Sequence, residues 1–94
     1  MVIGLITLTI NLPVAQSLKD KRSVIKGLMA GISRHFELSC AEVADHDLWH
    51  SAVIACVGVA AQKALIEPRL HHAVNWLEHQ RSDFEVLEYR IEFI

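Results

Sequence analysis

Hydrophobic and polar residues alternate with a period of two near both ends of the chain. In residues 2–12, the aliphatic side chains of Ile6, Leu8 and Ile10 alternate with polar ones, which is typical of a β-strand with one buried face. Pro13 cannot continue a ladder of hydrogen bonds and ends this strand. Residues 83–94 alternate in the same way and are predicted to form another strand. The apolar residues Leu87, Tyr89, Ile91 and Phe93 form one row of this strand, and Glu88, Arg90 and Glu92 form the other.

Residues 37–43 and 51–61 are predicted to form two further strands. The second of these is apolar on both faces, as is typical of a strand in the centre of a sheet. The connection between them, residues 44–50, is polar and contains Trp49. A turn centred on residues 47–48 places Cys40 opposite Cys56 as a cross-strand neighbour. The chain has neither a C-x-x-C motif nor a disulfide framework, so we expect two buried, reduced thiols.

The first helix is predicted to start at Ser17. The Ser17 side chain can cap free amides, and Asp20 takes the place of the acidic partner in a shortened capping box. Gly27 and Gly31 lie four residues apart in this helix, and we interpret them as points of close packing against the sheet. One apolar stripe follows at helical spacing, made of Leu18, Ile25, Leu28, Met29, Ile32 and Phe36.

The second helix lies within residues 62–80. Pro68 is tolerated only in the first turn of a helix or at a kink, so we expect the regular part to begin near Glu67.

The order strand, helix, strand, strand, helix, strand indicates one domain over residues 1–94. With right-handed crossovers it predicts an α+β, ferredoxin-like βαββαβ sandwich, in which a four-stranded antiparallel sheet carries both helices on one face. Ile3, Leu5 and one apolar row of residues 51–61 then lie on the other face. Because that row would otherwise remain in water, we expect the protein to form a homodimer.

Composition excludes several classes of function. The 94 residues carry a formal net charge of −2, which argues against a generally basic nucleic-acid binder, so any such contact must use a local patch. We find no transmembrane span and no signal peptide, and we therefore expect a cytoplasmic protein with no membrane partner. The scattered glycines form no phosphate-binding loop, and no serine or cysteine stands in a catalytic triad. We expect no cofactor and lean against an enzyme.

Basic residues crowd the start of the first helix. Exposed cations there are unfavourable by roughly 0.3–1 kcal/mol each, because the helix N-terminus itself carries partial positive charge. Internal pairing with Asp20, Glu42, Asp45 or Asp47 could offset this cost. The alternative is an external anion, such as an RNA phosphate. The candidate contacts to RNA or a partner are Lys19, Lys21, Arg22, Lys26 and Arg81.

His46, Asp47 and His50 form an H-D-x-x-H pattern, which differs by one residue type from the zinc-protease motif. That motif requires a helix so that both histidines meet one metal ion, whereas these residues fall in a short connection between strands. We therefore interpret them as a polar turn and expect no metal site. The topology brings this connection to the same end of the fold as the start of the first helix. The polar and aromatic cluster expected there is Ser17, Asp45, His46, Asp47, Trp49 and His50.

Two segments resemble the YlxP-like family, a bacterial domain of unknown function. They are Ser-Leu-Lys-Asp-Lys-Arg at residues 17–22 and Ala-Glu-Val-Ala-Asp-His-Asp-Leu-Trp at residues 41–49. The resemblance implies a ferredoxin-like fold and a bacterial cytoplasmic protein. In many relatives the gene lies near genes of translation initiation and ribosome maturation. His46 and His50 stand where many relatives have glutamine, and the family offers no catalytic residues to carry over.

These observations lead to three hypotheses of function. The first is a non-enzymatic accessory factor that contacts ribosomal RNA or a ribosomal protein. The second is a protein-interaction or self-assembly module, supported by the hydrophobic content of 52%. The third, supported only by the loose cluster of histidine and aspartate, is a metal-dependent or small-molecule enzyme.

Overall fold

The computed structural model of the chain describes residues 1–80 and 83–94, so the candidate contact Arg81 lies outside the described residues. Six elements follow one another in the predicted order. They are β1 (Val2–Asn11), α1 (Leu18–Phe36), β2 (Ser39–Ala44), β3 (Ser51–Ala60), α2 (Lys63–Glu78) and β4 (Glu85–Phe93). The ferredoxin-like α+β fold predicted from the sequence is confirmed.

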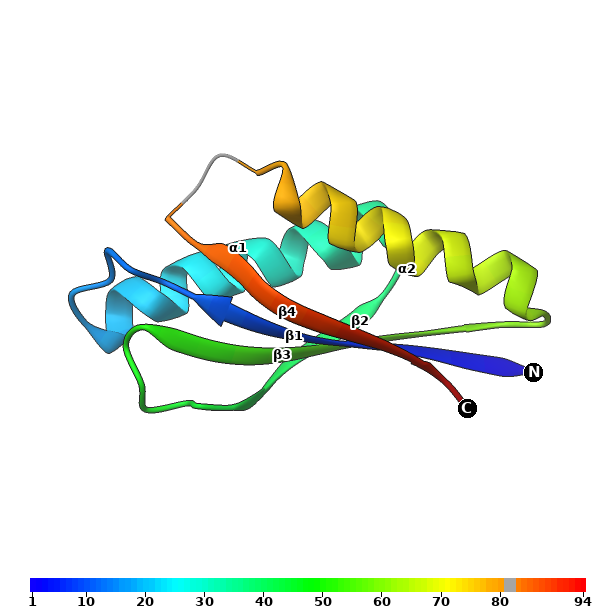
Figure 1. Cartoon of the computed structure of the whole chain (residues 1–94), viewed down its shortest axis with the longest axis horizontal. Helices are drawn as coiled ribbons and strands as arrows, with labels where there is room; N and C mark the ends of the chain where they lie inside the picture. The colour runs from blue at the N-terminus through cyan, green and yellow to red at the C-terminus, as the bar shows by residue number, and fades with distance from the viewer. Residues whose placement is uncertain (81–82) are drawn as a thin grey trace.

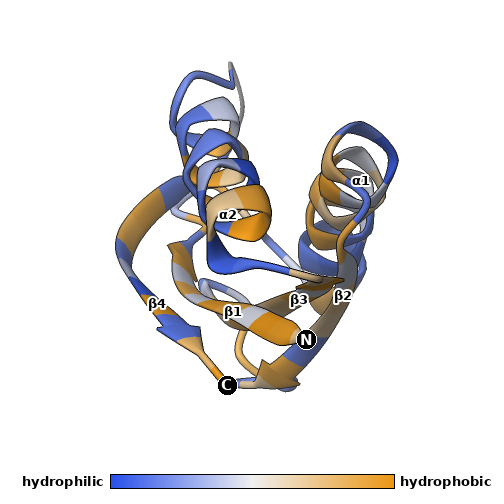
Figure 2. Ribbon diagram, turned by 90° about the vertical axis from the view of Figure 1, so that its right-hand side faces the viewer, coloured by the Kyte–Doolittle hydropathy of each residue, from blue (hydrophilic) through white to orange (hydrophobic). Residues whose placement is uncertain are grey.

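The four strands form one sheet in the order β2-β3-β1-β4, and each neighbouring pair is antiparallel. Both helices lie on the same face of this sheet, and the opposite face carries no helix (Figures 1 and 2). The two chain ends lie at one end of the molecule, and the β1–α1 and β2–β3 connections lie at the other (Figure 1).

The predicted register between β2 and β3 is confirmed. Cys40 pairs with Cys56, and the register holds from Ser39 to Glu42. It shifts between Glu42 and Ala44, where a bulge bends the strand as it enters the connection to β3.

The prediction for the start of β4 was wrong at Leu87, whose side chain is 60% exposed. Tyr89 and Ile91 pair with Leu8 and Ile6 of β1 as the alternation requires, although Tyr89 stays 45% exposed on this edge strand. The register then shifts, so that Val86 rather than Leu87 falls opposite Ile10. A β-bulge adds one residue to a strand and reverses the face of everything beyond it. The sequence alternation cannot reveal such a shift.

The core lies between the sheet and the two helices. Three alternating side chains of β1, Ile6, Leu8 and Ile10, are fully buried there. Of the predicted stripe on α1, Ile25, Leu28 and Ile32 are buried, while the other three members are partly exposed. The alternation in β1 and the helical periodicity in α1 therefore both predict residues of the same core, one from the sheet and the other from the helix layer.

Helix α2 begins at Lys63, earlier than expected, and Pro68 lies inside it. Proline lacks the amide hydrogen that would bond to the carbonyl one turn earlier. Ile66 and Leu70, on either side of Pro68, are both fully buried against the sheet. The packing of these two side chains stabilises the helix around Pro68, although proline disfavours the interior of a helix.

The interpretation of the two glycines in α1 was also wrong. A Cβ atom on Gly31 would overlap the indole ring of Trp76, so this glycine permits close contact with α2 rather than with the sheet. Among the described residues outside the backbone of its own helix and its chain neighbours, a Cβ atom on Gly27 would meet no atom within 4 Å. Gly27 therefore has no packing role among the described residues.

Candidate functional site

The β1–α1 connection and the β2–β3 connection lie side by side, as the topology predicted (Figure 1). The Leu12 amide donates to the His50 carbonyl at 2.9 Å, and the His50 Nε2–H donates to the Ala15 carbonyl at 2.9 Å. At the start of α1, the Ser17 hydroxyl accepts from the Asp20 amide at 3.0 Å. The Asp20 carboxylate in turn accepts from the Gln16 amide at 3.0 Å. The two predicted capping residues are thus confirmed. The Asp20 carboxylate accepts from the amide of Gln16, which precedes the capping residue Ser17.

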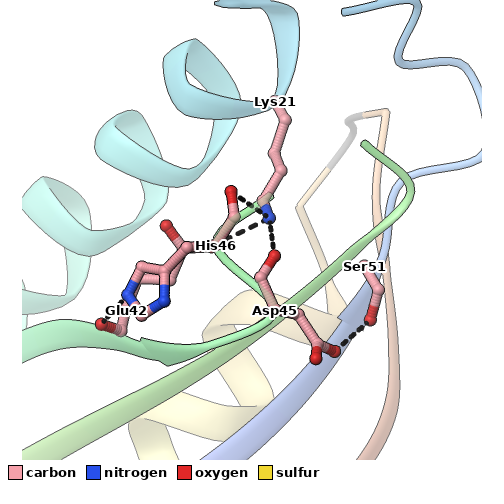
Figure 3. A network of polar contacts seen from close by, with 5 residues as sticks. All are labelled: Lys21, Glu42, Asp45, His46 and Ser51. Carbon is pink, nitrogen blue, oxygen red and sulfur yellow. Dashed lines mark hydrogen bonds and ion pairs between the residues drawn. The ribbon is translucent and has the colours of Figure 1, made fainter. Parts of the chain in front are cut away.

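Lys21 lies at the centre of this end of the fold and is fully buried. Its ammonium group forms an ion pair with Glu42 Oε2 at 3.0 Å. It also donates to the backbone carbonyl of Asp45 and, at 3.5 Å, to that of His46 (Figure 3). One cation from α1 is therefore held by an acidic side chain of β2 and by two carbonyls of the following turn.

Asp45 shapes that turn. Its backbone is in the left-handed region, with φ 61°, a conformation that aspartate tolerates better than most residues. Its carbonyl accepts from the Leu48 amide at 3.1 Å as well as from Lys21, and its carboxylate accepts from the Ser51 hydroxyl at 2.8 Å (Figure 3). Asp45 therefore joins the two ends of the β2–β3 connection to helix α1.

The burial of Lys21 corrects the expectation that it is available to an external anion. Either internal pairing or an external anion was expected to offset the positive charge at the start of α1. Lys21 is paired internally, with Glu42 as its partner. The other three candidate contacts on α1 are different. Lys19, Arg22 and Lys26 are exposed, and within residues 1–80 and 83–94 none of them has an ion pair or a side-chain hydrogen bond. We call these three residues the basic flank.

Two large hydrophobic side chains are exposed on the β2–β3 connection. Trp49 is 48% exposed and Leu48 is 52% exposed. The Trp49 ring meets the His50 ring edge-on, with centroids 6.4 Å apart. Trp49 was singled out from the sequence, but Leu48 was not. The exposure of Leu48 follows from the turn after Asp45, and the pattern of residues gives no sign of it.

The two histidines of the H-D-x-x-H pattern point to different partners. The His46 Nε2–H donates to the Glu42 carbonyl at 3.0 Å, whereas His50 bonds to Ala15 of the neighbouring connection. Asp47 is exposed. Among the residues that the structure describes, no three histidine, cysteine or acidic side chains converge in a way that could hold a metal ion.

Comparison with known families identifies the chain. Residues 3–91 match the model of the family described as "Protein of unknown function (DUF503)", and the chain belongs to that family. No curated protein matches the sequence. Among the described residues, no helix has the length and apolar character needed to span a membrane.

Proposed function

We propose that this protein is a non-enzymatic, cytoplasmic accessory factor of translation or ribosome maturation, which contacts RNA through the basic flank of α1. The observation that carries the proposal is a row of exposed cations, without an ion pair among the described residues, on a protein whose formal net charge is −2. The resemblance to YlxP-like proteins supports the link to translation, because the genes of many relatives lie beside genes of that process.

The spacing of the basic flank suits a phosphate backbone. Lys19 and Arg22 are three residues apart and Lys26 follows four later, so the three side chains project within about 60° of one another around the helix. Lysine and arginine on one face can follow successive phosphates, and each contact releases counterions. The flank runs from the first turn of α1 beside the connection that carries Trp49, whose ring offers a surface on which an unpaired base can stack.

RNA recognition on the sheet, as in RNA-recognition motifs, is not the mode we propose. Such modules stack bases on aromatic residues of the two central strands. Here the open face of β1 and β3 carries Thr7, Thr9, Val53 and Ala55 at corresponding positions. The contact would therefore be electrostatic, with Trp49 as its one aromatic contribution.

The test is a triple variant, Lys19→Ala with Arg22→Ala and Lys26→Ala, in binding to ribosomal subunits and to ribosomal RNA at graded salt. If the three residues contact phosphates, the slope of log affinity against log salt should fall by about 2–3, because each lost contact removes about 0.7–0.9 from it. A control variant removes two exposed cations that neither proposal uses, Arg34 and Lys63, and the two slopes are compared per cation removed. Equal slopes in the wild type and the triple variant would refute the proposal, as would an equal loss in the control.

We propose, as a second and compatible role, that the open sheet face mediates self-association into a homodimer. Val57 is 37% exposed and Val59 is 56% exposed on this face, beside the partly buried Leu5 of β1. We expect a second copy of the chain to cover this sheet face because the neighbouring row of β4 alternates in charge. In an antiparallel arrangement, a glutamate of the second copy can pair with Arg90 of the first. That row is Glu88, Arg90 and Glu92.

Light scattering at tens of micromolar tests the dimer. Val57→Asp should convert the dimer to a monomer because it places a charge in the apolar face. Leu65→Asp, which changes a 61% exposed side chain on α2, should leave the assembly unchanged. A monomeric wild-type protein under these conditions would disprove a stable dimer.

A further inference from the structure

Two cysteines that neither proposal uses lie directly opposite each other in the sheet. Cys40 of β2 pairs with Cys56 of β3, and both thiols are free. Because paired residues of neighbouring strands point to the same face, both side chains lie on the helix-covered side. Cys56 is fully buried, whereas Cys40 is only partly buried, because β2 is an edge strand. The prediction of two buried thiols thus holds for Cys56, while Cys40 remains accessible from the edge of the sheet.

The contact between the thiols makes them unequal. Hydrogen bonding from the Cys56 thiol to a Cys40 thiolate lowers the pKa of Cys40 more than partial burial raises it. The protonated Cys40 thiol donates instead to the Leu38 carbonyl at 3.9 Å. The same hydrogen bond, together with burial, raises the pKa of Cys56. The thiolate is the reactive form of cysteine, and reactive cysteines combine a lowered pKa with partial exposure. Cys40 is therefore the nucleophile of the pair, and Cys56 lies beside it as the resolving thiol.

We propose that Cys40 and Cys56 form a modification site at which a low-molecular-weight disulfide, of the class of oxidised glutathione, converts the pair to an intramolecular disulfide. In the first step, the Cys40 thiolate attacks one sulfur of the small disulfide. A bond forms between Cys40 and that sulfur, the original S–S bond breaks, and one small thiolate leaves.

In the second step, Cys56 gives its proton to the released thiolate and attacks the Cys40 sulfur. The Cys40–Cys56 bond forms and the second small thiolate leaves. It takes one proton from solvent, which balances the proton that the Cys40 thiol released to solvent when it ionised. The protein has lost two electrons and two protons, and the small disulfide has become two thiols. Once Cys40 carries a neutral disulfide, Cys56 no longer donates to a thiolate, so that one cause of its raised pKa is removed.

The position of the pair allows the bond to form. Directly opposite residues have Cβ atoms about 4.5–5.5 Å apart, and a disulfide requires about 3.5–4.5 Å. Cys40 is the second residue of a six-residue edge strand, which bonds to β3 alone. A small shift at the start of β2 therefore closes the gap without moving the central strands. A disulfide between such neighbours is strained, which keeps it reducible.

The test uses the full, reduced chain with an excess of oxidised glutathione, followed by alkylation and intact-mass measurement. The wild type should become two hydrogen atoms lighter, remain a single chain on a non-reducing gel and yield a cross-linked peptide pair. Cys56→Ser should instead accumulate one glutathione adduct, because the resolving thiol is missing. Cys40→Ser should react at least ten times more slowly than Cys56→Ser, since the remaining thiol is buried. Circular dichroism confirms folding, and Cys56→Ala replaces Cys56→Ser if the serine variant does not fold.

Three outcomes would overturn the proposal. The first is a wild-type protein that stays reduced in the folded state or keeps a stable glutathione adduct. The second is a Cys40→Ser variant that reacts as fast as Cys56→Ser. The third is oxidation through disulfides between chains. None of these outcomes depends on RNA binding or on the oligomeric state, so the proposal can fail separately from both proposed roles.

Discussion

Replacing Lys21 by methionine tests whether the buried ion pair stabilises the end of the fold that carries the candidate site. Methionine preserves most of the apolar stem but removes the ammonium group, so Glu42 loses its cation and the Asp45 and His46 carbonyls lose a donor. Removing one partner of a buried pair costs about 3–5 kcal/mol. The Glu42 side chain keeps 16% exposure, through which water can solvate it, and this favours the lower end, about 3 kcal/mol.

The assay is urea unfolding, followed by far-ultraviolet circular dichroism and by tryptophan fluorescence. Lys26→Met is the matched control in the same helix. Because Lys26 is exposed and has no ion pair within the described part of the chain, the free energy of unfolding should change by less than about 0.5 kcal/mol. Adding Glu42→Gln to Lys21→Met removes the orphaned charge, so the double variant should be less destabilised than the sum of the two single variants, by about 1 kcal/mol or more. The reasoning is wrong if Lys21→Met behaves like the Lys26 control.

Two other features of α1 lead to predictions that the same unfolding assay checks. Gly31→Ala should lower the unfolding free energy by about 1–3 kcal/mol because the new methyl group overlaps Trp76, whereas Gly27→Ala should raise it by about 0.5–1 kcal/mol. Effects of the same sign would contradict the assignment of Gly31 to the helix–helix contact. Ser17→Ala should cost about 1 kcal/mol through the loss of the cap, and Ser23→Ala, an exposed change inside the helix, should cost nothing. Equal effects at the two serines would show that the cap does not stabilise the helix.

Most of the fold could be predicted because its signals are local. The alternation in β1, the apolar stripe of α1 and the cap at Ser17 are each set by neighbouring residues, and all three hold in the structure. Even the pairing of Cys40 with Cys56 follows from one assumed turn position. The order of elements then leaves few topologies open, since the handedness of the crossovers is fixed.

The misplaced features depend on contacts between distant parts of the chain. The bulge that exposes Leu87 is a property of the pairing with β1, and the extra length of α2 before Pro68 depends on packing beneath Ile66. Lys21 is the clearest case in the candidate site. Lys19 and Arg22, close to it in sequence, are exposed and basic. Only the approach of Glu42 and Asp45 in space shows that Lys21 is buried. A cluster of basic residues in the sequence does not indicate which of them is buried against the rest of the protein.

The burial of Lys21 decides how the basic cluster of α1 should be tested. Because the Lys21 ammonium binds the Asp45 carbonyl, we expect substitutions of Lys21 to displace the connection that presents Leu48 and Trp49. A loss of RNA binding in a Lys21 variant would then follow from a disordered connection as readily as from a missing charge. The basic flank has no such structural contacts among the described residues, so its removal changes the charge while leaving the connection in place. Binding lost with the flank, together with unchanged unfolding, is therefore the result that identifies these cations as functional.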